Sequence, residues 1–300
     1  MPLHTDLRPK TFDEFMGNIP TIKSLKSVLV REDRPHTYLF YGERGCGKTT
    51  LARILANYVE CGENDTYEYN NSNTRGVDTA RNIIETAPYR SLSGKNKCYI
   101  LDEVHRTTLD FQSSMLKILE EPPVHVYFVL CTTNPEKLIK TILSRCRQYK
   151  VSPLSVDRLT KLLIRIRDTH NFNVTDELLM KIAEKTEGIP REALGVLDAI
   201  RDLKPHQMES AIDTVVLNDE TAVFELCQML LKGSWGKVET VLKGIRAEPE
   251  TVRRAVLGYF EKVLLNGGNK RAAVIIECFE NNFYDSGRSG LVLACYKTFF

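Results

Sequence analysis

The residues able to do chemistry lie in four short stretches of the first half of the chain. The stretch GERGCGKT (42–49) has the pattern G-x-x-x-x-G-K-T, whose glycines let backbone N–H groups face phosphate oxygens. In this pattern Lys48 would reach the β- and γ-phosphates, and the Thr49 hydroxyl would bind Mg²⁺. The run TYLFY (37–41) precedes it and a helical pattern follows, which is the context that the motif requires. A glycine-rich turn with a chance G-K-T is the weaker alternative.

The second stretch, CYILDEVH (98–105), places two carboxylates at the end of an apolar run. Ligands of open α/β sheets bind at the carboxyl ends of the strands. Asp102 would hold Mg²⁺ there, and Glu103 would act as the general base that polarises the attacking water. Carboxylates that only cap the next loop are the alternative, which the upstream phosphate-binding pattern disfavours. His105 is interpreted as a structural residue without a catalytic role.

The third and fourth stretches are CTTNPEKL (131–138) and TILSRCRQ (141–148). Thr133 and Asn134 follow an apolar run, so they would lie beside the phosphate loop and orient water or contact the γ-phosphate. An ordinary Asn-Pro turn explains Asn134 equally well. Arg145 keeps its charge at neutral pH, so a fixed Arg145 needs an anion, in this chain or in a neighbouring one. Otherwise it is a solvated surface charge.

The elements that must position these stretches are readable from the apolar patterns. Four runs have the length and composition of buried strands: TYLFY, TYEYN (66–70), CYIL (98–101) and VYFVLC (126–131). Because helical patterns separate them, a parallel sheet is predicted. After VSPLS (151–155) only helical patterns remain. The predicted fold is therefore α/β followed by all-α. The predicted domains are a nucleotide-binding α/β domain (1–152), a helical lid domain (153–216) and a second helical domain (217–300).

The composition sets broad limits on the class of protein. The chain has 300 residues, 42% hydrophobic and 27% charged, and a net charge of +2, so any basic groove would have to be local. No apolar run reaches membrane-spanning length, which favours a cytoplasmic protein with no membrane partner. Eight cysteines without a C-x-x-C pair predict reduced, mostly buried thiols, with no disulfide and no metal–thiolate site.

The ordered motifs across about residues 1–200 resemble those of the AAA+ clamp-loader ATPases. The similarity is chiefly to the bacterial DNA polymerase III gamma/tau subunits and extends to the small subunits of replication factor C. Beyond about residue 200 the chain matches only as a helical region. The motifs are RPKTFDEFMGN (8–18), GERGCGKT, LDEVH, LEEPP (119–123), CTTNPEKL, ILSRC (142–146) and GIPREAL (188–194).

The resemblance implies roles for individual residues. Thr133 would be the sensor 1 residue, and Arg191 would be sensor 2, reaching from the lid to the γ-phosphate of the same chain. Arg145 would be an arginine finger for the ATP of the next subunit, an interaction that raises turnover by about 10³–10⁵ in nucleotide hydrolases. The segment covering the adenine would contribute Arg8, Pro9, Met16 and Gly17. The nucleotide-binding loop would contribute Gly42, Glu43, Arg44, Gly45, Cys46, Gly47, Lys48, Thr49 and Thr50.

The resemblance also implies contacts with primer–template DNA and with a sliding clamp. A helix that starts near residue 74 suits backbone phosphates, although exposed helix charges are an equally good reading. The DNA candidates are Thr74, Arg75 and Arg81. The following segment corresponds to a clamp-facing element, but its apolar residues fit a core equally well. The clamp candidates are Ile83, Ile84 and Tyr89.

One segment departs from the bacterial pattern. The bacterial subunits usually carry a four-cysteine zinc module between the first helix and the second strand, whereas residues 57–70 contain only Cys61. We therefore expect no zinc. The segment NNSNTRGVDTAR (70–81) is nearer to replication factor C. This mixture indicates a divergent or phage-encoded loader, in the cytoplasm of a bacterial or phage-infected cell, without the long tail of tau.

The sequence therefore predicts a DNA-dependent ATPase subunit of a sliding-clamp loader that uses ATP and Mg²⁺. By resemblance it would assemble with other loader subunits, as a pentamer, through a collar formed by the second helical domain. A self-contained helical domain remains the alternative for that region. One alternative function is another AAA+ DNA motor, such as a branch-migration or recombination factor. The other is a non-catalytic scaffold, which the intact Lys48, Glu103 and Arg145 disfavour.

Overall fold

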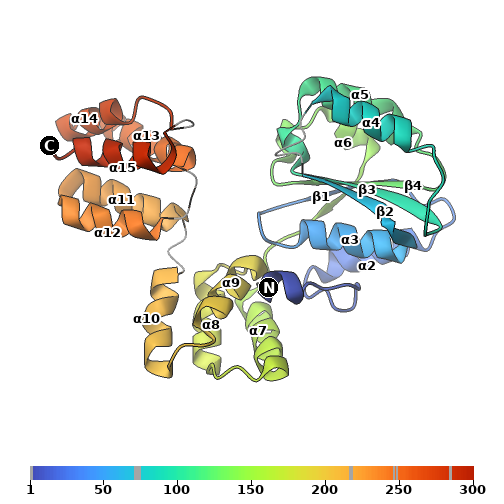
Figure 1. Ribbon diagram of the computed structural model, residues 1–300, viewed down its shortest axis with the longest axis horizontal. Coiled ribbons are helices and arrows are strands. Elements are labelled where there is room, and N and C mark those ends of the chain that lie inside the picture. The colour runs from blue at the N-terminus through green and yellow to red at the C-terminus, as the bar shows by residue number, and fades with distance from the viewer. Residues whose placement is uncertain (1–2, 71–75, 216–218, 246, 248, 284–285) are drawn as a thin grey trace. The chain divides into compact units, whose positions relative to one another are not determined.

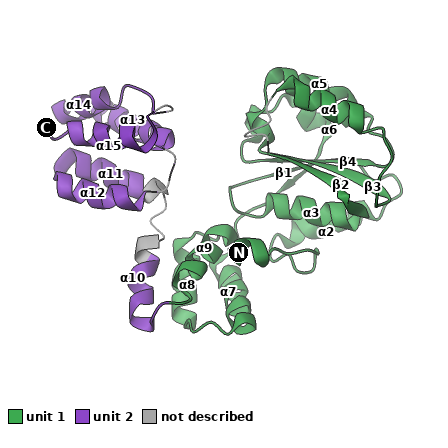
Figure 2. Cartoon of the chain, in the orientation of Figure 1, with its two compact units in different colours: residues 1–202 green, residues 203–300 purple. Residues whose placement is uncertain are grey.

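The chain divides into two compact units. The computed structural model describes residues 3–70, 76–215, 219–245, 247, 249–283 and 286–300. Unit 1 comprises residues 1–202 and unit 2 residues 203–300 (Figure 2). The finer division of the chain at residues 152 and 216 stays a prediction.

Unit 1 is built on a five-stranded parallel sheet with the strand order β2-β3-β4-β1-β5. The central strand β4 has all seven residues buried, as expected for a sheet with both faces covered. Helices α2 and α3 cover one face, and α4, α5 and α6 cover the other (Figure 1). The strands are β1 (Thr37–Tyr41), β2 (Cys61–Asn70), β3 (Asn96–Asp102), β4 (Val126–Thr132) and β5 (Arg147–Lys150).

The four predicted strands are confirmed, and β5 was missed. Strand β5 has the sequence RQYK, in which only Tyr149 is buried, so it lacks the apolar run that revealed the others. It pairs with β1 in the register Tyr38↔Arg147 and Tyr41↔Lys150. Pairing with a neighbouring strand, rather than local hydrophobicity, therefore makes this segment the outermost strand of the sheet.

Alternating side chains of the strands enter two separate cores. Tyr38 and Phe40 pack with α2 and α3 on one face, while Leu39 packs with α4, α5 and α6 on the other. This is the period of two that a strand imposes on its side chains. The helices of this layer are α2 (Ile19–Leu29), α3 (Lys48–Tyr58), α4 (Val77–Thr86), α5 (Leu109–Glu120) and α6 (Lys140–Arg145). Two short 3₁₀ helices, η1 (Val104–Arg106) and η2 (Pro135–Lys137), follow β3 and β4.

Three further helices complete unit 1: α7 (Val156–His170), α8 (Asp176–Lys185) and α9 (Pro190–Ile200). Ser155 and Thr175 cap the first two with side-chain oxygens that accept backbone N–H groups, and Pro190 begins the third. The N-terminal helix α1 (Leu3–Asp6) packs against α9. The segment before α2 is thereby brought beside the α7–α9 layer, close to the phosphate loop.

Unit 2 is entirely helical in its described part. Its helices are α10 (Pro205–Val215), α11 (Asp219–Lys232), α12 (Trp235–Gly244), α13 (Pro249–Leu265), α14 (Lys270–Cys278) and α15 (Gly287–Lys297). The apolar stripe of α13 buries Val252, Val256 and Phe260 in a single core formed with α11, α12, α14 and α15. Seven of the eight cysteines of the chain are buried and all eight are free thiols, so the predicted burial is confirmed.

Candidate nucleotide-binding site

The phosphate loop lies between β1 and α3, as its motif predicts. Gly45 and Gly47 have φ values of +82° and +99°, a region that residues with a Cβ atom rarely adopt. A Cβ atom on Gly42 would lie 2.0 Å from the carbonyl oxygen of Val151, and one on Gly45 would lie 2.6 Å from Cγ2 of Ile189. The glycines therefore permit both the curl of the loop and its close approach to β5 and to the start of α9.

Lys48 is buried at the first turn of α3, with its ammonium group turned onto the loop. Its Nζ donates to the carbonyl oxygens of Gly42 at 2.9 Å and Glu43 at 2.7 Å. Burial lowers the pKa of Lys48, and the nearby thiols and carboxylates, among them Cys131 and Glu103, oppose that shift. A phosphate anion would satisfy this buried cation better than two neutral carbonyls can.

Thr49 and Asp102 face each other across the site. The Thr49 hydroxyl donates to Oδ2 of Asp102 at 2.8 Å, which joins the start of α3 to the end of β3. A hydroxyl and a carboxylate are hard oxygen ligands that suit Mg²⁺, which usually keeps several waters and takes further oxygens from phosphates. In the described part of the chain, no group of three or more His, Cys, Asp and Glu side chains is arranged as a metal site. The pair thus fits a magnesium ion that a nucleotide brings, rather than a protein cage.

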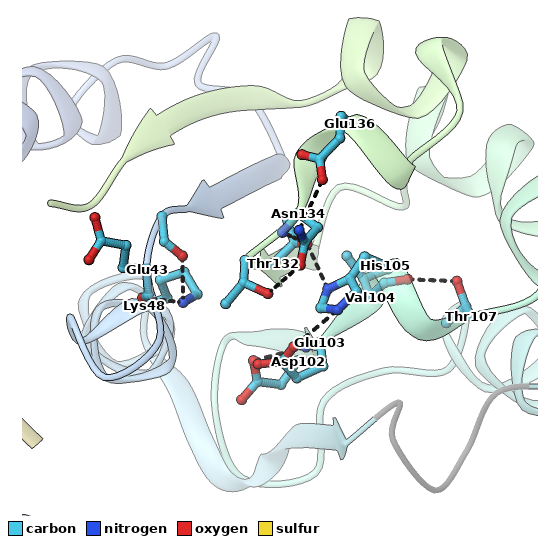
Figure 3. Close-up of polar contacts among 12 residues, drawn as sticks. Glu43, Lys48, Asp102, Glu103, Val104, His105, Thr107, Thr132, Asn134 and Glu136 are labelled. Carbon is cyan, nitrogen blue, oxygen red and sulfur yellow. Dashed lines mark hydrogen bonds and ion pairs between the residues drawn. The ribbon is translucent and has the colours of Figure 1, made fainter. Parts of the chain in front are cut away.

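Glu103 follows Asp102 in the left-handed backbone conformation, with φ +52°. Its backbone N–H donates to Oδ1 of Asp102, and its carboxylate lies 3.5 Å from Nε2 of His105. His105 Nδ1 in turn lies 2.9 Å from Oγ1 of Thr132, the last residue of β4 (Figure 3). His105 thus links the ends of two strands, a contact that the sequence did not reveal.

Thr133 and Asn134 form a compact polar turn after β4. The Asn134 N–H donates to Thr132 Oγ1 at 3.0 Å, and the Thr133 hydroxyl donates to Oδ1 of Asn134 at 2.9 Å. The Asn134 amide also donates to Glu136 at 2.9 Å (Figure 3). Neither Thr133 nor Asn134 lines the cavity described below, so in this structure their connection to Glu103 runs through Thr132 and His105.

A cavity of about 400 Å³ opens beside the phosphate loop, a size typical of small-molecule sites. Arg191 lines it, and its Cβ lies near Gly45, so the structure brings this predicted lid residue to the loop. Gly17 has φ +81° and packs on Leu154 instead of lining the cavity. The predicted residues that do line it are Arg8, Pro9, Met16, Arg44, Gly45, Cys46, Gly47, Lys48, Thr49, Thr50, Asp102, Glu103 and Arg191.

Sequence reasoning missed the contribution of α7 to this cavity. One face of the helix supplies Leu162, Arg165, Ile166, Thr169 and His170. The amphipathic pattern of α7 predicts a helix, but it does not say what its partly apolar face contacts. Only the packing of the three-helix layer identifies these residues as candidates for contact with a base.

Arg145 lies far from this cavity. The cavity lies at the edge of the sheet where the strands end, and Arg145 lies at the edge where they begin. The register Tyr38↔Arg147 puts Arg145 before the start of β1, whereas the phosphate loop follows the end of β1 at Tyr41. Helix α6, which ends at Arg145, also covers the other face of the sheet from α3. The guanidinium group is held by Glu120 at 2.6 and 3.0 Å and by the carbonyl oxygen of Thr141.

The residues predicted to contact DNA or a clamp lie in different surroundings. Thr74 and Arg75 lie outside the described residues. Arg81 is exposed on α4 and pairs with Asp78 one turn earlier, at 3.3 Å. Ile83 is fully buried in the core, as its alternative interpretation predicted, because α4 turns this residue toward the sheet. Ile84 packs partly on the same core, and Tyr89 is exposed.

Together the sheet, the phosphate loop and the α7–α9 layer have the architecture of the AAA+ fold, a parallel sheet followed by helices, which confirms the predicted fold class. The structure superimposes on the Holliday junction branch migration motor RuvB of Thermotoga maritima with a TM-score of 0.60. The superposition covers 80% of this chain and 86% of RuvB at 20% sequence identity. No helix of the described chain is both long and apolar enough to span a membrane.

Sequence comparisons place the chain near DNA polymerase III subunits. Residues 68–155 match the family model described as DNA polymerase III, delta subunit. The chain is 34% identical to the tau/gamma subunit of Haemophilus influenzae over 64% of this chain and 31% of that protein. It is 28% identical to the tau subunit of Escherichia coli over 86% of this chain and 44% of that protein. The chain thus resembles gamma/tau, as predicted, and spans about a third to a half of the length of these two relatives.

Proposed function

We propose that this chain is an ATPase subunit of a sliding-clamp loader, which uses ATP to open the clamp and place it on primer–template DNA. The observation that carries the proposal is a separation within unit 1. A nearly complete nucleotide site lies at one edge of the sheet, while the arginine expected to complete it lies at the other edge. Such a site needs a neighbouring subunit, as in a ring or spiral. The similarity to gamma/tau supports this arrangement.

In the proposed site, each residue has a chemical role that its position suits. Lys48 would leave the carbonyl oxygens of its loop for the phosphates, and Arg191 would approach the γ-phosphate from α9. A magnesium ion held by Thr49 and Asp102 would neutralise phosphate charge. Glu103 would polarise the attacking water. Thr133 and Asn134 would influence the position of Glu103 indirectly, through the turn after β4.

The partners of the chain are part of the proposal. We expect other loader subunits, identical or different, to contact the edge that carries Arg145, with the helices of unit 2 forming a collar. Arg81 on α4 would contact DNA phosphates. The remaining candidates for contact with a clamp are the half-buried Ile84 on α4 and the exposed Tyr89 in the loop before β3.

The test is ATP turnover by the chain alone and with candidate partner subunits, clamp and primed DNA. We expect weak turnover by the chain alone and stimulation by clamp plus primed DNA. Arg145→Ala should lower the stimulated turnover by about 10³-fold, because a finger of this kind contributes about 10³–10⁵. ATP binding to the isolated Arg145→Ala chain should persist, since Arg145 is remote from the cavity.

A mixture of variants tests whether the arginine acts between copies. Arg145→Ala and Glu103→Gln are each inactive alone, but mixed assemblies contain interfaces with an intact Glu103 facing an intact Arg145. Partial recovery of turnover in the mixture supports the placement of the arginine in a neighbour's site. If the clamp does not stimulate turnover and the chain instead drives branch migration or unwinding, the alternative of another AAA+ motor replaces the clamp-loader proposal.

A further inference from the structure

The imidazole of His105 is a buried group that faces two strand ends. Its side chain is only 7% exposed and lies on η1, directly after β3. Nδ1 is 2.9 Å from Thr132 Oγ1 at the end of β4, and Nε2 is 3.5 Å from the Glu103 carboxylate (Figure 3). Each ring nitrogen therefore has a partner. Glu103 directly follows β3 and Thr132 ends β4, and these two strands are neighbours in the sheet.

The hydrogen-bonding capacity of these partners selects one arrangement of protons. The Thr132 oxygen already accepts the N–H of Asn134, and its hydroxyl hydrogen is free to be donated to His105. An ionised carboxylate can only accept, so the nitrogen that faces Glu103 has to carry the hydrogen. The chain of hydrogen bonds then runs from Asn134 N–H to Thr132 Oγ1 and from Thr132 O–H to Nδ1. The protonated Nε2 lies 3.5 Å from the Glu103 carboxylate, so this last contact is electrostatic in character.

The other protonation states are less favourable. With the hydrogen on Nδ1, the lone pair of Nε2 would face the negative carboxylate. The doubly protonated ring would put a charge into a buried position. Burial lowers the pKa of His105, while the adjacent Glu103 partly opposes this shift and the nearby Arg106 adds to it. The neutral ring with its hydrogen on Nε2 satisfies all four groups.

We propose that His105 is a positioning residue that couples the turn after β4 to the orientation of the Glu103 carboxylate. The inference rests on the proposed ATPase function, in which Glu103 polarises water. If a phosphate nearby shifts the turn at Thr132–Asn134, the imidazole of His105 would move with it and change the orientation of the Glu103 carboxylate. The predicted sensor residues do not line the cavity, and this link gives their turn a physical connection to the proposed base.

Steady-state kinetics test the coupling. His105→Ala should lower kcat by about 100-fold, which is the loss expected for misplacement of a reacting group by about 1 Å. The KM for ATP and the affinity for a fluorescent ATP analogue should change little, because Lys48 and the loop are untouched. His105→Gln, whose amide N–H reaches the position of Nε2, should recover part of kcat. His125→Ala is the matched control, since His125 lies in the loop before β4 and its ring bonds the carbonyl oxygen of Tyr89, at 3.0 Å, away from both strand ends.

Thr132→Val tests the second half of the link. Valine keeps the shape of the buried threonine and removes its hydroxyl. It should lower kcat by about 10-fold, and the double variant with His105→Ala should be no slower than His105→Ala alone, because both changes break the same chain of bonds. Full kcat in Thr132→Val, or multiplied losses in the double variant, would overturn the coupling.

A spectroscopic readout separates this inference from the proposed activity. Long-range ¹H–¹⁵N spectra of histidine-labelled protein at neutral pH should show His105 as the neutral form protonated at Nε2. Thr132→Val should shift its Nδ1 resonance, while His125 stays unchanged. Hydrogen on Nδ1, or a doubly protonated ring, would overturn the inference even if the chain hydrolyses ATP. If the wild type has no turnover, the proposed function fails, whereas the expected spectrum would still support the His105 link.

Discussion

The parallel sheet has one edge where its strands end and another where they begin, and these two edges hold their charged groups in different ways. Where the strands end, Lys48 is buried and bonded to its own loop, and Thr49 is paired with Asp102 beside a cavity. Where the strands begin, Arg145 is partly exposed and paired with Glu120, whose side chain is 57% exposed. The first arrangement suits a ligand that enters from solvent. The second arrangement suits an anion supplied by another molecule, because little free energy is needed to break an exposed ion pair.

The largest expected effect on ATP binding is at the buried edge. Lys48→Ala should weaken ATP binding by at least about 100-fold. It removes the two proposed hydrogen bonds from Lys48 to the phosphates, and hydrogen bonds to charged groups contribute about 1.5–3 kcal/mol each. Titration of a fluorescent ATP analogue measures this directly. The control is Lys95→Ala, which removes a lysine that pairs with Glu60 on the surface. Wild-type affinity in Lys48→Ala would mean that the cavity is not the nucleotide site.

A smaller effect is expected where the phosphate loop meets α9. In Gly45→Ala the new Cβ atom would lie 2.6 Å from Ile189 and 3.4 Å from the Cβ of Arg191, at a φ of +82°. Backbone strain and overpacking of this kind cost about 1–3 kcal/mol each, so we expect lower stability in urea and about 10-fold weaker ATP binding. The new atom should push the loop away from the start of α9.

Gly76→Ala is the matched control for this substitution. Gly76 has φ −90°, and a Cβ atom there meets nothing within 4 Å. Because Gly76 is the N-cap residue of α4, where alanine is less favourable than glycine, stability should fall by no more than about 1 kcal/mol. If Gly45→Ala behaves like Gly76→Ala in both assays, the contact between loop and α9 does not hold the nucleotide site together, and the proposed role of Arg191 loses its support.

The two edges also differ in how far the sequence predicts them. The phosphate loop and Asp102 were predictable because a local motif fixes glycines, lysine and hydroxyl next to strands with apolar runs. Strand β5 was not, because its four residues gain their structure from pairing with β1. The partnership of Arg145 with Glu120, 25 residues apart, depends on how α5 and α6 pack.

The same reasoning explains what the sequence left open at individual residues. Ile83 and Tyr89 lie in one short segment, yet the first is buried and the second exposed, because α4 ends at Thr86 and the chain then leaves the core. The sequence did not reveal the contacts of His105, since one partner, Glu103, follows β3 and the other, Thr132, ends β4. Contacts between strands that are distant in the sequence leave no local pattern.

The smallest expected effect belongs to the exposed edge. Glu120→Gln removes the charge that faces Arg145, and surface pairs of this kind contribute about 0–1 kcal/mol, so thermal unfolding should change little. The same pair has to be broken before Arg145 can reach a neighbour. Removing it should therefore raise partner-dependent turnover, by no more than about fivefold for about 1 kcal/mol.

The exposed neighbour Glu121, changed to Gln, is the control for this last substitution. A large fall in turnover with unchanged stability would reverse the interpretation of the exposed edge. Glu120 would then present the arginine in the orientation that the neighbouring site needs, and would not merely hold it until assembly. Both edges would in that case be preorganised, one by burial and the other by an ion pair, and the difference between them would lie only in which molecule supplies the missing partner.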